Sequence, residues 1–226
     1  PRKVAPGFET PAGRIRWAPD SRTILFQATT GTTAHLFSVP ATGGEPKRVT
    51  GGDAVFGGFS FSADGRTVAF TRSDLQQPAD IHVATLPAMT PVRLSRQNPQ
   101  LDSISLGRGE AFRWKSSDGM EMEGVVVYPP NYTAGRRYPL LTNVHGGPSG
   151  VWTQSFPGGW GNYAQVWAGA GWVVFLPNPR GSSGYGEKFL RANIRDWGGG
   201  DYRDIQTGID ELVRRGVADT ARLGQT

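Results

Sequence analysis

The sequence predicts a mixed fold, with an all-β first half over residues 1–108 and an α/β second half over residues 109–226. Two observations predict this division. A segment of the first half recurs after 44 residues, which is typical of repeat architectures. Beyond Gly109 the hydrophobic pattern changes from short alternating strands to strands that alternate with helices. The length of 226 residues allows one large or two small domains.

The repeat is visible in two pairs of segments. Residues 17–26 (WAPDSRTILF) and residues 61–70 (FSADGRTVAF) share four identical positions at an offset of 44. The segments that follow, 36–50 and 81–95, align at an offset of 45. Two unrelated hairpins with common turn residues are the alternative, but the second pair of aligned segments favours a true repeat.

Each repeat is predicted to contain three or four strands. Asp-Ser and Asp-Gly before Arg-Thr supply a tight turn, because these residues tolerate the backbone angles that it requires. An aromatic residue before the turn, Trp17 or Phe61, and alternating apolar residues after it fit two strands packed on one face. A period of about 45 residues is the length of one β-propeller blade. We therefore expect two blades in residues 1–108 and further blades before them, because a closed propeller needs at least about four.

The second half is predicted to open with a hairpin. Ser-Asp-Gly at 117–119 is its expected turn, and Pro129-Pro130 ends its second strand. The elements after it alternate, which predicts parallel strands joined by crossovers. The predicted strands are 111–116, 121–128, 140–144 and 172–176, and the predicted short helix, with Tyr163, Val166 and Trp167 at helical spacing, is 160–169.

Residues 201–215 carry the clearest helix pattern. Asp201 is the predicted N-cap, and Gly216 suits the position just after the helix. One apolar stripe runs along the helix, at Ile205, Ile209, Leu212 and Val213. A last extended stretch is predicted at 222–226.

The tetrapeptide His145-Gly146-Gly147-Pro148 is the main candidate site. It follows a predicted buried strand, and two consecutive glycines let the backbone approach a ligand and present N–H groups to it. In acyl-transfer enzymes such N–H groups stabilise the oxyanion of the tetrahedral intermediate. An ordinary strand-to-helix turn is the alternative interpretation of the tetrapeptide alone.

Four motifs in order resemble the prolyl oligopeptidase family of serine peptidases, in its acylaminoacyl-peptidase and dipeptidyl-peptidase-IV-type branch. They are KSSDGMEMEGVVVYPP, YPLLTNVHGGPSG, LPNPRGSSGYGEKF and GGGDYRDI. The resemblance implies an N-terminal β-propeller followed by an α/β-hydrolase domain. Residues 1–108 would then be the last two propeller blades, and residues 109–226 would be the first half of the hydrolase domain, ending just before the nucleophile.

The resemblance also assigns roles to single residues. Gly147 would turn its backbone N–H toward the oxyanion, Gly146 would shape the loop, and His145 would anchor it without acting as the catalytic base. Arg180 lies in a loop near the active-site entrance, and we expect it to support structure through hydrogen bonds and ion pairs rather than to contact substrate.

The nucleophile motif of the α/β-hydrolase fold, G-x-S-x-G, is absent from the sequence. Ser149 and Ser182 lie in tetrapeptides that resemble it but bring the closing glycine one place early, and we do not expect either to be a nucleophile. No histidine occurs after Gly184, so a Ser-Asp-His order cannot be completed. The resemblance places the serine within about three residues after Thr226. The 226 residues alone are therefore predicted to be inactive.

Composition argues against several other classes. The net charge is +5 with scattered basic residues, whereas nucleic-acid binding needs a basic cluster. There is no cysteine, and the three histidines are too far apart for a local metal site. The run Gly181-x-x-Gly184-x-Gly186 has the wrong order for a dinucleotide loop, so no cofactor is predicted. No apolar run is long enough to span a membrane.

The sequence therefore predicts a serine peptidase that cleaves short peptides in its full-length form. Its expected partners are peptide substrates and the remainder of the same polypeptide. A homo-oligomer and the cellular compartment, cytoplasmic or periplasmic and secreted, stay open. Two alternatives also stay open, namely a non-catalytic propeller-containing module that binds peptides or a partner chain, and an esterase of the same fold.

Overall fold

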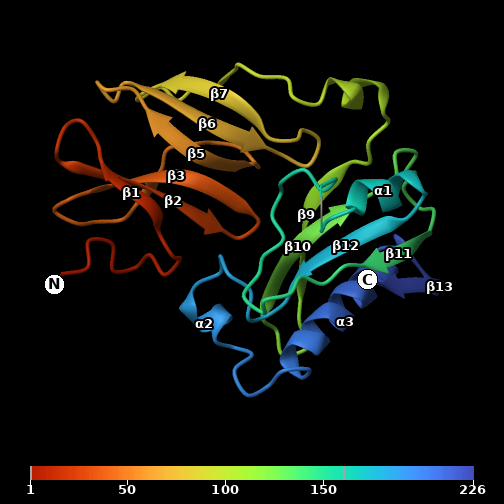
Figure 1. Ribbon diagram of the computed structural model, residues 1–226. Coiled ribbons are helices and arrows are strands. Elements are labelled where there is room, and N and C mark those ends of the chain that lie inside the picture. The colour runs from red at the N-terminus through yellow and green to blue at the C-terminus, as the bar shows by residue number, and fades with distance from the viewer. Residues whose placement is uncertain (1, 160) are drawn as a thin grey trace.

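The computed structural model describes residues 2–159 and 161–226 and contains two β-sheets with few helices (Figure 1). The first sheet, red to yellow in Figure 1, has eight strands, and the second, green to blue, has five. The strands of the first sheet are β1 (Gly13–Trp17), β2 (Thr23–Thr30), β3 (Thr33–Pro40), β4 (Lys47–Arg48), β5 (Val55–Phe61), β6 (Thr67–Ser73), β7 (Asp80–Thr85) and β8 (Val92–Arg93).

The two sequence repeats form two corresponding sets of four strands. Strands β1 to β4 and strands β5 to β8 are each joined by antiparallel pairs between neighbours in the chain. One parallel pair, Ala34 with Val55, connects the two sets. The predicted turns are confirmed, because the Asp20 carboxylate accepts the Arg22 amide at 2.9 Å and the Asp64 carboxylate accepts the Arg66 amide at 3.0 Å.

Aromatic side chains fill the interior of the first sheet. Phe26 stacks on Phe37 with ring centroids 5.6 Å apart, and Phe56 lies 5.7 Å from Phe70. The predicted alternation holds at Phe26 and Phe70, which are both buried. Trp17 differs from the prediction and is 56% exposed, because it ends the edge strand β1, whose residues are all exposed.

His35 of β3 is a buried imidazole, and it gives the first sheet a pH dependence. Its Nδ1 lies 2.8 Å from the Thr50 hydroxyl, and its Nε2 lies 3.5 Å from the Arg48 guanidinium. Burial, and to a lesser degree Arg48, lower the pKa of His35 to about 4. The fold therefore favours the neutral ring.

We expect the protein to lose stability as the pH falls below 6.5, the ordinary His35 pKa, toward 4. In this window the unfolded chain binds a proton at His35 that the folded chain does not, so stability rises with pH. By pH 4.5 the loss attributable to His35 is about 2 kcal/mol. Urea unfolding at pH 7 and 4.5 measures it, and the His35→Gln variant should lose correspondingly less between these pH values. An equal loss in both proteins would contradict this assignment.

The second sheet has the strand order β13-β11-β12-β10-β9. Strand β11 pairs in parallel with both β12 and β13, whereas β10 is antiparallel to β12 and β9. The predicted hairpin and the parallel crossovers are confirmed. The strands are β9 (Gly109–Lys115), β10 (Glu121–Val127), β11 (Tyr138–Thr142), β12 (Val173–Asn178) and β13 (Ala218–Gln225), the last beginning four residues before the predicted stretch.

The helices differ in detail from the sequence prediction. They are the 3-10 helix η1 (Pro99–Ser103), α1 (Ala164–Gly169), α2 (Glu187–Leu190) and α3 (Gly200–Arg214), and η1 and α2 were not predicted. No helix within the described residues is long and apolar enough to cross a bilayer.

The helix predicted at 160–169 begins only at Ala164, and Trp160 lies outside the described residues. Its predicted apolar side is also reversed. Ala164 and Ala168 pack on the sheet, whereas Val166 is 63% and Trp167 is 41% exposed. Small residues face the strands because they allow the helix to approach them closely.

Helix α3 packs on the opposite face of the second sheet from α1. The prediction of Asp201 as its N-cap is wrong. The helix starts after Gly199, and the Asp196 carboxylate accepts the Gly200 amide at 2.8 Å. Gly216 has the predicted left-handed backbone, with φ of 73°. Leu212 of the predicted stripe is fully buried in the core, and Ile209 and Val213 pack against it while partly buried.

Candidate active site

The glycine loop, residues 145–150, follows the carboxyl end of the central parallel strand β11. Gly146 and Gly147 are exposed, and Gly147 has a φ of 124°, a conformation that favours glycine. The Gly150 amide donates to the Gly146 carbonyl at 3.2 Å. Within the described residues no hydrogen bond uses the amide N–H of Gly146 or Gly147. The loop therefore presents two N–H donors to solvent at the edge of the sheet.

The last strand of the chain ends beside this loop. Gln225 of β13 pairs with Thr142 of β11, and the Thr226 amide donates to the Thr142 carbonyl at 3.0 Å. Parallel strands place their carboxyl ends at the same edge of a sheet, where ligands of α/β proteins bind. The ends of β11 and β13 are therefore next to each other at the edge that carries the glycine loop.

A second loop, residues 178–185, begins with the last residue of β12 and holds the glycine loop in place. The Asn178 side chain accepts the Trp152 amide at 2.7 Å and donates to the Trp152 carbonyl at 2.9 Å. The Ser183 amide donates to the Gly150 carbonyl at 3.2 Å, and its hydroxyl donates to the Ser149 carbonyl at 2.6 Å. These four hydrogen bonds fix both the glycine loop and the residues just after it.

His145 and Ser182 meet between the two loops. The Ser182 hydroxyl donates to the Pro179 carbonyl at 2.6 Å and lies 2.9 Å from His145 Nε2, and His145 Nδ1 lies 3.1 Å from the Gly146 carbonyl. Burial lowers the pKa of His145 and keeps the ring neutral. Ser182 is completely buried, with its proton engaged, and Ser149 lies in a turn. Neither serine has the surroundings of an activated nucleophile.

Arg180 turns its side chain away from the glycine loop and into a buried ion pair. Its Nε and Nη2 donate to the two carboxylate oxygens of Asp204 at 2.9 and 2.8 Å, and its backbone amide donates to the same carboxylate at 2.9 Å. Asp118 lies 2.9 Å from the guanidinium, and the Ser116 hydroxyl donates to Asp204 at 2.6 Å. The hydrogen bonds with Asp204 raise the pKa of Arg180.

The structure thus brings His145, Gly146 and Gly147 together, whereas the Arg180 side chain of the second loop pairs with Asp204. Sequence reasoning missed Asn178 and Ser183 as contacts of the glycine loop. Asn178 could have been identified from its position as a polar residue at the end of a buried apolar strand, because a buried side-chain amide needs hydrogen-bond partners. Within the described residues, no group of three or more histidine, aspartate or glutamate side chains could hold a metal ion.

The chain is similar in sequence to known proteins. A model of the prolyl oligopeptidase family matches residues 160–226, which include the second loop and β13. The dipeptidyl-peptidase 5 of Arthroderma otae is 29% identical over 209 residues, and the probable dipeptidyl-peptidase 5 of Aspergillus clavatus is 30% identical over 211 residues. These alignments cover 90% and 89% of the chain.

The chain belongs to the prolyl oligopeptidase family. It spans 28% of the length of these curated relatives. The acylaminoacyl peptidase of Pyrococcus horikoshii has a TM-score of 0.78 at 24% identity, with 96% of this chain and 33% of that chain covered. The dipeptidyl peptidase 4 of Porphyromonas gingivalis has a TM-score of 0.76 at 17% identity, with 97% and 31% covered. Both structures share the fold of this prolyl oligopeptidase family chain.

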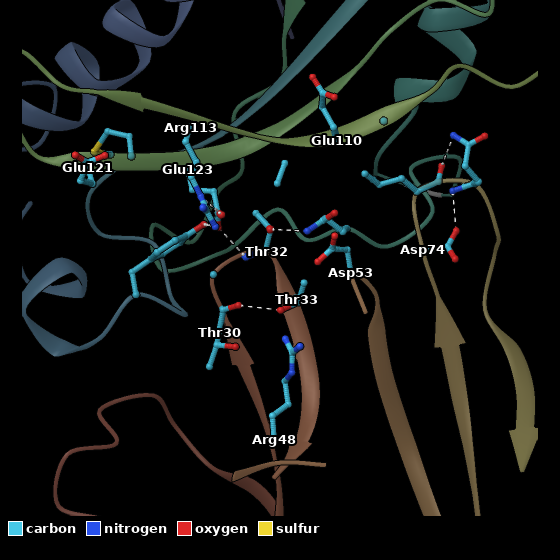
Figure 2. A pocket seen from close by; sticks show the side chains of 18 of the residues that line it. Thr30, Thr32, Thr33, Arg48, Asp53, Asp74, Glu110, Arg113, Glu121 and Glu123 are labelled. Atoms are coloured by element: carbon cyan, nitrogen blue, oxygen red, sulfur yellow. Dashed lines mark hydrogen bonds and ion pairs between the residues drawn. The ribbon is translucent and has the colours of Figure 1, made fainter. Parts of the chain in front are cut away.

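In this protein, a cavity of about 1240 Å³ lies between the two sheets. Figure 2 shows Thr30, Thr32 and Arg48 on the side of the first sheet, facing Arg113 and Glu123 on the side of the second. The glycine loop does not line this cavity, but Tyr185 of the second loop does. The second loop therefore lies between the cavity and the glycine loop.

Proposed function

We propose that this chain is part of a serine peptidase that hydrolyses short peptides, of the acylaminoacyl-peptidase or dipeptidyl-peptidase type. In this proposal residues 1–108 are the last two blades of a β-propeller, and residues 109–226 are the first half of an α/β-hydrolase domain. The four-stranded repeats support the first assignment, and the parallel strands β11, β12 and β13 support the second. The relatives named dipeptidyl-peptidase 5 support the reaction.

The observation that carries the proposal is the position of the Gly147 loop beside the carboxyl end of β13. A serine placed about three residues after Thr226 would emerge next to the loop, at the sharp turn from strand to helix that this fold uses for its nucleophile. The amide N–H of Gly147 makes no hydrogen bond within the described residues and lies on an exposed loop. It is therefore free to bind a developing oxyanion.

The proposed reaction divides the work between this chain and residues outside it. A serine hydroxyl attacks the peptide carbonyl and gives its proton to a histidine base, which then protonates the leaving amine. The carbonyl oxygen becomes an oxyanion in the tetrahedral intermediate, and the N–H of Gly147 donates to it. His145 has no role in proton transfer, because its Nε2 is engaged with Ser182. It anchors the loop instead.

Labelling of the complete protein with a fluorophosphonate tests the proposal. We expect one covalent adduct, on a serine within about three residues after Thr226, because only an activated nucleophile reacts with such a probe. The labelled residue is identified by mass spectrometry of the proteolysed protein. An adduct on Ser149 or Ser182, or no adduct at all, would contradict the proposal, and the absence of an adduct would favour a binding module.

Substrate comparison separates the peptidase from an esterase of the same fold. We expect the complete protein to release the chromophore from dipeptide and N-acylaminoacyl anilides as well as from p-nitrophenyl esters. Hydrolysis of esters alone would contradict peptidase action while leaving the labelled serine in place.

A further inference from the structure

Tyr185 occupies a central place in a hydrogen-bond chain that the proposed reaction does not use. Its hydroxyl donates to the Glu123 carboxylate at 3.1 Å and accepts a hydrogen bond from the Asn178 amide at 2.9 Å. Its ring packs against Phe189 with centroids 4.8 Å apart, which holds the side chain in this orientation. Burial, together with the Glu123 carboxylate, raises the pKa of Tyr185, so the hydroxyl stays protonated and remains a donor.

On one side, these hydrogen bonds lead from Tyr185 to the glycine loop. Asn178 is completely buried and uses its side chain for Tyr185 and for both backbone polar groups of Trp152. Trp152 lies two residues after the glycine loop, and its indole N–H donates to the Asn143 carbonyl just before that loop at 3.0 Å. The orientation of the Asn178 amide therefore controls the segment that closes the glycine loop.

On the other side, the hydrogen bonds lead from Tyr185 to the first sheet. The turn between β2 and β3 inserts Thr32 against the second sheet, and the Thr32 amide donates to Glu123 at 3.1 Å. Neighbouring backbone contacts fix the same turn. The Gly31 backbone N–H donates to the Gly184 carbonyl at 2.8 Å, and the Gln154 backbone N–H donates to the Thr32 carbonyl at 2.7 Å. Glu123 is buried and also accepts from Arg113 Nε at 3.0 Å. Figure 2 shows Thr32, Arg113 and Glu123 converging between the sheets.

We propose that Tyr185 is a positioning residue, whose hydroxyl links the β2–β3 turn of the first sheet to the glycine loop through Glu123 and Asn178. This inference rests on the proposed function of that loop. A buried hydrogen-bond chain is rigid when every member is satisfied, and loss of one member leaves its neighbours without partners. Removal of the hydroxyl would leave the Asn178 amide and the Glu123 carboxylate each one partner short. The first sheet thereby helps to set the orientation of the Gly147 amide.

The Tyr185→Phe variant of the complete protein tests the inference, because it removes the hydroxyl and keeps the ring. We expect kcat for a dipeptide anilide to fall about tenfold with KM changed less than about twofold, the pattern of a lost transition-state interaction. We also expect the amide hydrogen of Trp152, which is bonded to Asn178, to exchange about tenfold faster while the global melting temperature changes little. A residue that only packs would leave the local exchange unchanged.

Tyr202→Phe is the matched control, because Tyr202 is an exposed tyrosine of α3 outside this chain of hydrogen bonds. It should leave kcat and the exchange of Trp152 unchanged. If Tyr185→Phe loses cooperative unfolding, Glu123→Gln decides the question, and its Trp152 amide should also exchange faster. Normal exchange at Trp152 in a folded Tyr185→Phe protein would overturn the inference. The exchange measurement does not depend on activity, so an inactive wild-type protein would count against the proposed function alone.

Discussion

Replacement of Asp204 by alanine should lower the free energy of unfolding by about 3–5 kcal/mol, the cost of breaking a buried ion pair from one side. Asp204 is completely buried and accepts hydrogen bonds from the Arg180 side chain, the Arg180 amide and the Ser116 hydroxyl. The alanine variant leaves all three donors without this acceptor in the interior. Equilibrium unfolding in urea measures the loss as a lower midpoint at unchanged slope.

Asp118→Ala is the matched control, because Asp118 contacts the same guanidinium with a side chain that is 49% exposed. An exposed carboxylate adds little to stability, so we expect a loss below about 1 kcal/mol. A double variant, Arg180→Met with Asp204→Leu, should recover part of the stability, since it removes both charges. Equal losses for Asp204→Ala and Asp118→Ala would show that burial of this pair does not govern its contribution.

The strands of this chain follow from local chemistry, and for that reason the sequence predicted them well. In the Asp20 and Asp64 turns the carboxylate binds a backbone amide only two residues further along the chain, and the hairpin of β9 and β10 is indicated by its turn residues. The family resemblance likewise depended on short motifs that retain their order in the chain.

The helix errors arose where tertiary contacts decide. At α1 the apolar residues Val166 and Trp167 suggested the buried side, but Ala164 and Ala168 are the residues that pack on the sheet. At α3 the start depends on Asp196, which folds back onto Gly200 from outside the helix. Neither outcome can be read from a periodic pattern alone.

The hydrogen bonds that hold the candidate site could not be predicted from the sequence, because the paired residues are far apart in the chain. His145 and Ser182 are 37 residues apart, Tyr185 and Glu123 are 62 apart, and Thr32 and Glu123 are 91 apart. The glycine pair could be identified as a candidate because the whole motif is contiguous. The residues that hold it could not, because their pairing is created by the two sheets meeting.

The largest effect on activity is expected from Gly147→Ala in the complete protein. Gly147 has a φ of 124°, which alanine adopts only with strain, and an added Cβ would lie 2.9 Å from the Gly150 amide nitrogen. The loop must therefore shift and carry the proposed oxyanion donor with it. Loss of one such donor lowers kcat about 100-fold to 1000-fold. Because the loop is exposed, the melting temperature should change little.

Two further glycines separate loss of the donor from general backbone strain. Gly135 also has a positive φ, of 84°, but a Cβ there would meet no atom within 4 Å, so Gly135→Ala should introduce strain without altering kcat. The φ of Gly146 lies outside the left-handed range that favours glycine, and a Cβ there would meet no atom within 4 Å. Gly146→Ala should therefore reduce kcat far less than Gly147→Ala. Steady-state kinetics on one dipeptide anilide compares the three variants. Similar losses in all three would mean that the Gly147 amide has no special part in stabilising the oxyanion.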